Sequence, residues 1–515
     1  MKKLVSLLLA IVMVLSLAAC AGQNNGGINA GNQGGGNGPS GTLRIAVANF
    51  GYGTDWLQSL AQVYMAKNRN AKIIVEGTVI PYQLLQQIEG GFTKYDFFFG
   101  TAELHYKSEY FVELSDLYAS VPEGENKTIE EKIGSLTENF RYNGKYYAVP
   151  YVMSPTGMVV NEDTMREVYG EDYPLPNTTN EMLAIFDELK AKNVVPFIDT
   201  STGYVKSLIQ TWFIQYDSVG YHNYYTGYYI DENGETQRAL NAESMMQPGK
   251  EIAMQLGYTL LDSSLGYNHP YAGSMDFAEA QIAFCGHGYG SIDERKIAFT
   301  PNGAWLENEM ELTLEEYPVD LRMFRVPVIS EIINVLPDQS VANDAELSAL
   351  ITAIDAGSTS LSGSGYEVTQ NDFDRVREAR SYVDHVSDGH QAGIVKTCQS
   401  VELAKDFLRF LASDAASSLA MDELDGLTLA YGYTPAEDQT AECSYFIQSV
   451  YDTIEGCTWV NHHGTDKLNG LNLAADINGL ASVFLIGEKD GKTVYKEDIQ
   501  KYQAQWKYML ATEEN

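Results

Sequence analysis

The sequence predicts an α/β protein built around a parallel sheet, and two observations carry this prediction. Strand-like and helix-like segments alternate from residue 42 to residue 99, with apolar residues first at every second position and then at helical spacing. The composition is that of a globular protein, because 44% of the 515 residues are apolar and 20% are charged. A strand–helix–strand–helix–strand order implies parallel strands with helices on both faces of the sheet. A chain of this length is ample for sizeable cores and suggests about three domain-sized units or two large lobes.

Each segment of this first unit has its own signal. In chain order we predict a strand at 43–47, a helix at 56–64 capped by Thr54 or Asp55, a strand at 71–76, a helix at 82–89 and a strand at 95–99. Further on, Asn143-Gly144 predicts a hairpin turn, and residues 221–229 predict a Tyr-dense loop or hairpin. Ligands of open parallel sheets lie beyond the carboxyl ends of the strands. Those ends carry Asn49 and Tyr52 after the first strand and Glu103 after the third.

The net charge excludes one class of partner. With 34 Lys and Arg against 69 Asp and Glu, the formal net charge is −35. Such a chain repels phosphate backbones and anionic lipid headgroups, so we expect no nucleic-acid partner.

The first residues have the pattern of an export signal. Lys2 and Lys3 precede an apolar run from 4 to 17, about 21 Å of helix and too short for a bilayer core of about 30 Å. Leu17-Ala18-Ala19-Cys20 resembles the bacterial lipobox, which implies a signal peptide over 1–19 and a diacylglycerol on Cys20. Dual acylation would anchor the chain to the extracytoplasmic face of the cell membrane. Residues 20–41 are rich in Gly, Asn and Gln, and predict a flexible tether. The alternative is an ordinary secretion signal with a chance cysteine.

The remaining cysteines and histidines predict neither a metal site nor a cofactor. Cys443 and Cys457 are close enough in sequence for a disulfide bridge, and free thiols at Cys285, Cys398, Cys443 and Cys457 are the alternative. The eight His residues are scattered without zinc-ligand spacing. No nucleophile elbow, phosphate-binding loop or His-Glu-x-x-His motif occurs, so we predict that the chain is not an enzyme.

Several blocks, in a shared order, resemble the extracellular solute-binding proteins of ABC importers, in the carbohydrate-type group. The blocks are Tyr110 to Leu117, Asn143 to Tyr151, Gly157 to Asp163, Pro176 to Leu189, Thr300 to Trp305 and Val401 to Ser413. The resemblance covers roughly residues 42–435, while 221–275 and 331–395 match poorly and look like insertions.

The resemblance implies a two-lobe periplasmic-binding-protein-like fold (type II), each lobe being a mostly parallel sheet flanked by helices. It implies an N-terminal lobe of 42–150 with about 321–412, and a C-terminal lobe of 151–320 with about 413–515. The implied partners of the monomer are a saccharide clamped between the lobes and the subunits of an ABC permease. Two alternatives stay open, namely a non-sugar solute such as a peptide, polyamine or metal chelate, and a surface sensor or structural lipoprotein without transport.

Sugars are bound by aromatic rings on their C–H faces and by Asp, Glu, Asn or Gln at their hydroxyls. Trp305 is the first candidate, because the matching family position lines the cleft; packing in the core is the alternative. Tyr151 follows the crossover block and suits either the cleft or the core. Trp459, beside His462-His463, is a further candidate, and Asn49, Tyr52 and Glu103 rest on the strand-end rule.

Overall fold

A computed structural model of the whole chain provides the structure. It describes residues 38–49, 51–100, 104–226, 228–230, 236–238, 247–262, 264–286, 295–360, 367–386, 389–461, 489–497, 499–501 and 504. The described residues belong to one compact unit that begins at Gly38. The expected signal peptide, Cys20 and residues 20–37 of the tether lie outside them.

The first sheet confirms the predicted parallel unit and adds two strands to it. Its order is β2-β1-β3-β14-β6, with β1 parallel to β2 and β3, and β14 antiparallel to β3 and β6. The strands are β2 (Ala71–Thr78), β1 (Gly41–Ala48), β3 (Phe97–Gly100), β14 (Gln391–Ile394) and β6 (Val149–Pro150). Strand β14 comes from the range 331–395, so part of that presumed insertion is core.

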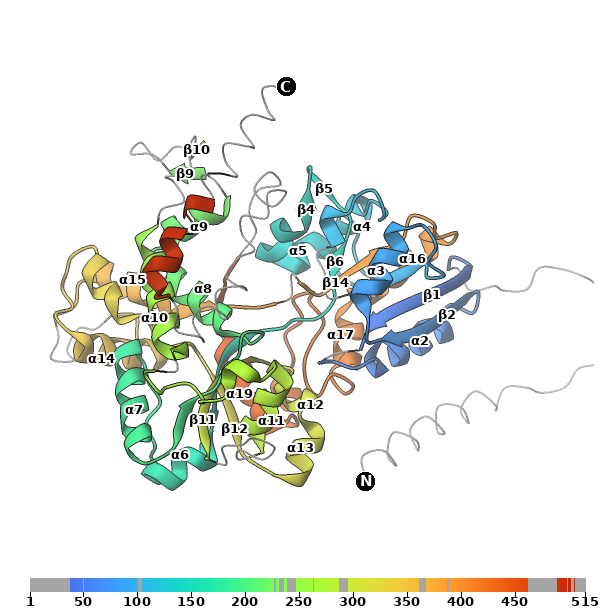
Figure 1. Cartoon of the computed structure of the whole chain (residues 1–515). Helices are drawn as coiled ribbons and strands as arrows, with labels where there is room; N and C mark the ends of the chain where they lie inside the picture. The colour runs from blue at the N-terminus through green and yellow to red at the C-terminus, as the bar shows by residue number, and fades with distance from the viewer. Residues whose placement is uncertain are drawn as a thin grey trace, which may run out of the picture. The chain divides into compact units, whose positions relative to one another are not determined.

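Side chains of the first sheet alternate between two apolar layers, as the pleat requires. Phe97 and Phe99 pack in the layer of α2 and α16, whereas Ala46 and Phe98 pack in the layer of α3. Figure 1 shows these helices around β1 and β2. The helices of this part are α2 (Asp55–Lys67), α3 (Pro81–Glu89), α4 (Ser115–Tyr118), α5 (Ile129–Ile133), α16 (Val401–Leu411) and α17 (Asp414–Ala420).

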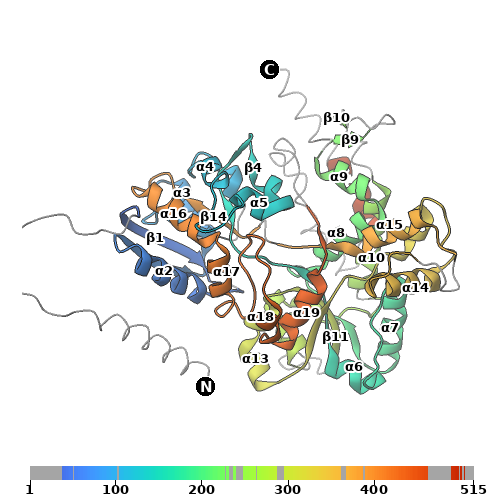
Figure 2. The ribbon, with the colours of Figure 1, turned by 180° about the vertical axis from the view of Figure 1, so that it is seen from behind.

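The second sheet has the order β12-β7-β11-β8, with β7 antiparallel to both neighbours and β8 parallel to β11. Its strands are β12 (Leu321–Phe324), β7 (Thr156–Asn161), β11 (Ile297–Gly303) and β8 (Val195–Phe197). One face packs against α7 (Thr179–Ala191), α8 (Val205–Tyr216) and α10 (Pro248–Leu261). The other packs against α11 (Phe277–Cys285), α12 (Leu306–Glu309) and α19 (Tyr445–Ile454), and Figure 2 gives the view from behind.

The remaining elements are short connections and additions to this frame. They are η1 (Leu104–Tyr106), η2 (Gly134–Phe140), β4 (Arg141–Tyr142), β5 (Lys145–Tyr146), α6 (Glu162–Tyr169), α9 (Ser218–Thr226), β9 (Tyr228–Ile230), β10 (Thr236–Arg238), η4 (Ala272–Ser274), α13 (Glu311–Glu316), η5 (Ser330–Val335), α14 (Asp344–Asp355), α15 (Gln370–Ser381), β13 (Tyr382–Val383), α18 (Glu437–Ala441) and β15 (Thr458–Trp459). The Asn143-Gly144 hairpin is confirmed, since both residues have the positive φ, 50° and 72°, of a tight two-residue turn.

The expected Tyr-dense loop at 221–229 was wrong for most of its length. Helix α9 runs through this range to Thr226. Tyr221 and Tyr224 are three residues apart, so they share one helix face, and their rings lie 5.2 and 5.9 Å from the ring of Phe213 on α8. Burial of this tyrosine pair against α8 stabilises the helix where local sequence offers only turn-like residues.

Three chain segments join the two sheets, and they bond to one another. Residues 151–155 connect β6 to β7, and the segment between β13 and β14 runs beside them through a bridge of Pro155 with His385. The backbone N–H of Met153 donates to the carbonyl of Thr428 in the third segment, at 3.1 Å. Strand β12 pairs with β7 and β14 pairs with β3, so the range 321–412 contributes to both sheets. Where the lobe boundaries fall along the chain stays a prediction.

The cysteines are free thiols. Cys285, Cys398, Cys443 and Cys457 are all unbridged. Cys443 and Cys457 flank α19, a ten-residue helix of about 15 Å, whereas a disulfide needs Cα atoms within about 7 Å. The possible Cys443–Cys457 bridge is therefore excluded in this structure.

In the part of the chain that the structure describes, no helix combines the length and the apolar character needed to cross a bilayer.

Candidate functional site

Trp305 lies directly after β11, and the residues before it explain its position. Its ring sits over Gly303, where a Cβ atom would come within 2.0 Å of the indole. The side-chain oxygen of Asn302 accepts the backbone N–H of Gly303 at 2.8 Å and fixes the turn. Only glycine at residue 303 lets the indole lie against the end of the strand, which gives the Asn-Gly-Ala-Trp sequence a physical reason.

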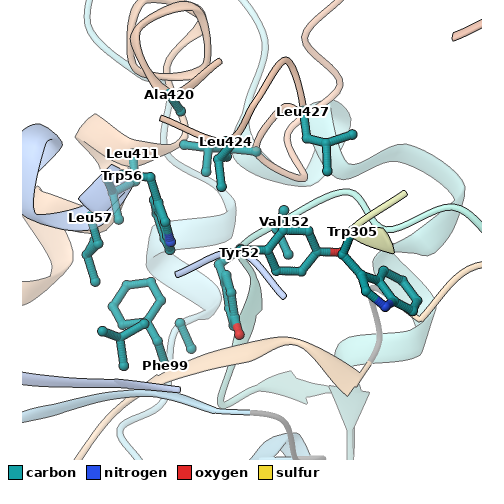
Figure 3. Close-up of a cluster of buried hydrophobic side chains, with 14 of the residues drawn as sticks. Tyr52, Trp56, Leu57, Phe99, Val152, Trp305, Leu411, Ala420, Leu424 and Leu427 are labelled. Carbon is teal, nitrogen blue, oxygen red and sulfur yellow. The ribbon is translucent and has the colours of Figure 1, made fainter. Parts of the chain in front are cut away.

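Two tyrosines cover this indole. One follows a strand of the first sheet, and the other precedes a helix that packs on the second sheet. Tyr52, in the loop after β1, meets Trp305 edge-on with ring centroids 6.3 Å apart. Figure 3 shows the two side chains next to each other. Tyr204, just before α8, has its ring centroid 5.3 Å from that of Trp305. Trp305 is only 4% exposed as a result. We call Tyr52, Tyr204 and Trp305 the aromatic cluster.

A carboxylate borders the aromatic cluster. Glu309 follows Trp305 by four residues, which is about one helical turn along α12. One carboxylate oxygen accepts the side-chain N–H of Gln281 at 3.0 Å, and Oε1 lies 3.5 Å from the position of a Cβ added to Gly51. Burial raises the pKa of Glu309, while the hydrogen bond from Gln281 acts in the opposite direction. Glu309 thereby links the end of the second sheet to the loop that carries Tyr52.

Asp199 holds the start of α8, and with it Tyr204. Its carboxylate accepts the backbone N–H groups of Tyr204 and Val205 at 3.0 and 2.8 Å. Burial raises the pKa of this carboxyl to about 7, although the N–H donors favour the ionised form. The Asp199 side chain therefore fixes the position of Tyr204, a member of the aromatic cluster.

Tyr52 also bonds to the joining segments. Its hydroxyl donates to Ser154 Oγ at 2.6 Å, and this oxygen lies 3.2 Å from Nδ1 of His390. Tyr151, in the same joining segment as Ser154, stacks on Trp56 with ring centroids 5.8 Å apart and donates to the carbonyl of Gly100 at 3.3 Å. The aromatic cluster and the Trp56–Tyr151 pair are thus neighbours.

The structure brings together only some of the predicted site residues. Tyr52 and Trp305 are in contact, and Tyr151 lies nearby in the Trp56–Tyr151 pair. Asn49 is exposed at the end of β1. Trp459, half-buried, packs against His385 at 5.7 Å, with β15 paired to β13. Glu103 and the His462-His463 pair lie outside the described residues.

Sequence reasoning missed three residues of this region, namely Tyr204, Gln281 and Glu309. Glu309 had a usable signal, because its spacing of four from Trp305 puts both on one face of a helix. Nothing in the sequence pattern distinguished Tyr204 or Gln281 from their neighbours.

A separate polar cavity of about 450 Å³ lies beside α5 and α17. It is lined by Gly124, Glu125, Asn126, Lys127, Glu131, Lys132, Asp414 and Gly432. The ammonium group of Lys132 pairs with Glu125 and, at 2.7 Å, with Asp414, so the charges are compensated within the chain. Nowhere among the described ranges do three His, Cys, Asp or Glu side chains gather as metal ligands.

Comparison with known proteins identifies relatives of the chain. The sequence model of the family described as bacterial extracellular solute-binding protein matches residues 51–417. A search of curated proteins gives no match.

Three solved structures resemble the chain over about nine-tenths of its length. A chitin oligosaccharide binding protein is 14% identical, with a TM-score of 0.57 and coverage of 91% of this chain and 100% of that chain. The solute-binding protein RafE in complex with raffinose is 16% identical, with a TM-score of 0.56 and the same coverage. The GacH receptor of Streptomyces glaucescens, solved unliganded and with acarbose, is 13% identical, with a TM-score of 0.57 and coverage of 91% and 99%. These likenesses show a two-lobed α/β fold, in which each sheet described above is the centre of one lobe.

Proposed function

Since the family model matches most of its length, this chain belongs to the bacterial extracellular solute-binding proteins, and we propose that it captures a saccharide and delivers it to an ABC permease. Proteins with this fold include binders of chitin oligosaccharide, raffinose and acarbose. The family acts by binding, so no catalytic step is assigned to the chain.

The observation that carries the proposal is the combination of the Trp305 ring with polar side chains close to it in the fold. The indole is a flat apolar surface, and Glu309, four residues further on, has a carboxylate that bonds Gln281 and can bond hydroxyls. A pyranose ring presents apolar C–H faces and a rim of hydroxyls, which matches this combination. Of the other predicted site residues, Tyr52 contacts Trp305, whereas Asn49, Glu103, Tyr151 and Trp459 stay predictions.

Capture requires the two lobes to separate, because Tyr52, which follows a strand of the first sheet, covers the indole that the second sheet carries. We propose that the three joining segments act as the hinge and that the ligand replaces the ring contacts of Tyr52 with Trp305. A ligand shifts this equilibrium only by its greater affinity for one arrangement of the lobes. Closure around the ligand then excludes water from its hydroxyls.

Attachment to the membrane is a separate part of the proposal. It rests on the resemblance of Leu17-Ala18-Ala19-Cys20 to a lipobox and on the Gly/Asn-rich tether that follows. Expression of the wild-type chain and of Cys20→Ala in a bacterial host, followed by detergent phase partitioning, tests it. We expect the wild-type chain in the detergent phase and the variant in the aqueous phase; wild-type protein in the aqueous phase contradicts the anchor.

Saccharide capture is tested by a thermal-shift and calorimetric screen of the purified protein. The panel contains raffinose, acarbose, chitin oligosaccharides, short peptides, polyamines and divalent metals. A ligand at 100 times its Kd adds about 2.7 kcal/mol to the free energy of unfolding, which is measurable in a chain of this size. We expect stabilisation by one saccharide class. Stabilisation only by peptides, polyamines or metals overturns the sugar assignment, and no stabilisation at all argues for a role without solute capture.

A further inference from the structure

Tyr52 covers Trp305 from a short segment of the first lobe in which a glycine stands on either side of it. Gly51 and Gly53 have φ of 54° and 62°, in the left-handed region that favours glycine. A Cβ atom added to Gly51 would lie 3.3 Å from the Cβ atom of Trp305, so this segment rests directly on the end of the second sheet. Tyr52 is itself only 5% exposed. The cover over the indole is therefore a contact between the two lobes that the chain itself makes.

The hydroxyl of Tyr52 is held by the segments that join the two sheets. It donates to Ser154 Oγ at 2.6 Å, and burial raises the pKa of Tyr52 well above its ordinary value, so the hydroxyl remains a donor. A serine hydroxyl both accepts and donates, so Ser154 can donate in turn to Nδ1 of His390, which lies 3.2 Å away. The imidazole also packs edge-on against Tyr52, with ring centroids 5.5 Å apart. Ser154 and His390 together fix both the hydroxyl and the ring of Tyr52.

Ser154 and His390 lie where two of the joining segments bond to each other. The backbone N–H of Tyr151 donates to the carbonyl of His390 at 3.2 Å, and that of Val386 donates to the carbonyl of Ser154 at 3.0 Å. Both residues are thus part of the proposed hinge, whereas Tyr52 belongs to the first lobe. Rotation of the lobes about the joining segments changes the distance from Tyr52 to Ser154, and a hydrogen bond tolerates only a narrow range of distance and angle. The bond therefore favours one arrangement of the lobes, the one in which the indole is covered.

We propose that Ser154 and His390 are positioning residues of the saccharide site, which hold Tyr52 over Trp305 and so lower the affinity for the sugar. This inference rests on the proposed function, in which the ligand replaces the contact of Tyr52 with Trp305. When only a fraction of the molecules is competent to bind, the apparent Kd is the intrinsic Kd divided by that fraction. The bond from Tyr52 to Ser154 reduces this fraction. It thereby sets the sugar concentration at which the site fills, although neither Ser154 nor His390 needs to contact the sugar.

The test uses isothermal titration calorimetry of the full chain with raffinose, acarbose and chitin oligosaccharides. Tyr52→Phe removes the hydroxyl and keeps the ring, Ser154→Ala removes the acceptor, and His390→Phe removes the ring nitrogens and keeps an aromatic ring. Tyr118→Phe is the matched control, because Tyr118 is fully buried beside the first sheet and its hydroxyl donates to the carbonyl of Ala148 at 2.8 Å. Unfolding midpoints without ligand show whether each variant folds.

For the saccharide that the wild-type protein binds, we expect Kd to fall about threefold to tenfold in Tyr52→Phe and in Ser154→Ala, and to fall less in His390→Phe. The Tyr118→Phe control should keep the wild-type Kd. The double variant of Tyr52→Phe with Ser154→Ala should bind as each single variant does, since both changes remove the same bond. A purely structural role would not tighten binding, so the direction of the change identifies the positioning role.

An unchanged or raised Kd in either Tyr52→Phe or Ser154→Ala overturns the inference and leaves the proposed function standing. An equal fall of Kd in the Tyr118→Phe control also overturns it, because the loss of any buried hydroxyl then has the same effect. Absence of binding by the wild-type protein to all three saccharides overturns both.

Discussion

The aromatic cluster around Trp305 and the Trp56–Tyr151 pair are equally hidden from water, yet their surroundings differ. Trp56 is 1% exposed and Trp305 is 4% exposed. Trp56 meets Phe99 and Tyr151, and Figure 3 shows leucine side chains of α16 and the following segment around it. Trp305 instead lies within four residues of Asn302 and Glu309, and Glu309 bonds the amide of Gln281. Burial alone therefore does not separate a core aromatic from a binding aromatic, whereas the polar neighbours do.

Alanine substitution should separate the two tryptophans most clearly. We expect Trp56→Ala to lower the free energy of unfolding by about 3–5 kcal/mol, because it empties a close-packed apolar layer. Trp305→Ala should cost less stability and should abolish detectable saccharide binding. Denaturant unfolding and calorimetry measure both effects. An equal stability loss in the two variants, with binding retained in Trp305→Ala, would assign Trp305 to the core.

Gly303→Ala should disturb the aromatic cluster although none of the three aromatic residues is changed. The added methyl group lies within 2.0 Å of the Trp305 indole, so the ring must move, at a cost of about 1–3 kcal/mol. Gly273→Ala is the matched control, since nothing lies within 4 Å of its added Cβ. Tryptophan fluorescence and thermal unfolding report the change. Identical spectra and midpoints for the two variants would contradict the described contact.

Asp199→Asn should produce the smallest effect, confined to pH dependence. The pKa of Asp199 is raised by folding to about 7, so the stability it contributes is full below about pH 4 and is lost as the pH rises through about 7. Asparagine keeps an acceptor oxygen for the N–H groups of Tyr204 and Val205 but does not titrate. Between pH 5 and pH 8 we expect the wild-type Tm to fall relative to the variant by about 2 °C. Parallel curves would mean that the N–H donors keep Asp199 ionised throughout.

Local patterns in the sequence were sufficient for the first three strands of the first sheet and the helices between them. Apolar alternation at 43–47 and helical spacing at 56–64 are properties of neighbouring residues, and both elements formed as expected. Strand β14 was not predicted, because it is four residues long and pairs with β3 from the far end of the chain. Of the two alternatives for Cys443 and Cys457, the structure shows free thiols, because the helix between them separates its two ends.

Part of the site was predictable for a chemical reason. Tyr52 follows the end of a strand, and Trp305 follows a glycine that its ring requires. Both residues could therefore be recognised from the sequence. Gln281 left none, because a polar residue on an apolar helix usually faces solvent. Its hydrogen bond to Glu309 forms only once α11 and α12 are packed together.

The pairing of β3 with β14 sets the order in which the protein can assemble. Residues 97–100 are made early and residues 391–394 late, so the edge of β3 stays open during most of the chain's synthesis. Contacts between such distant segments must first overcome the entropy of closing a long loop, which slows folding. A nascent chain shorter than about 390 residues therefore cannot complete its first sheet.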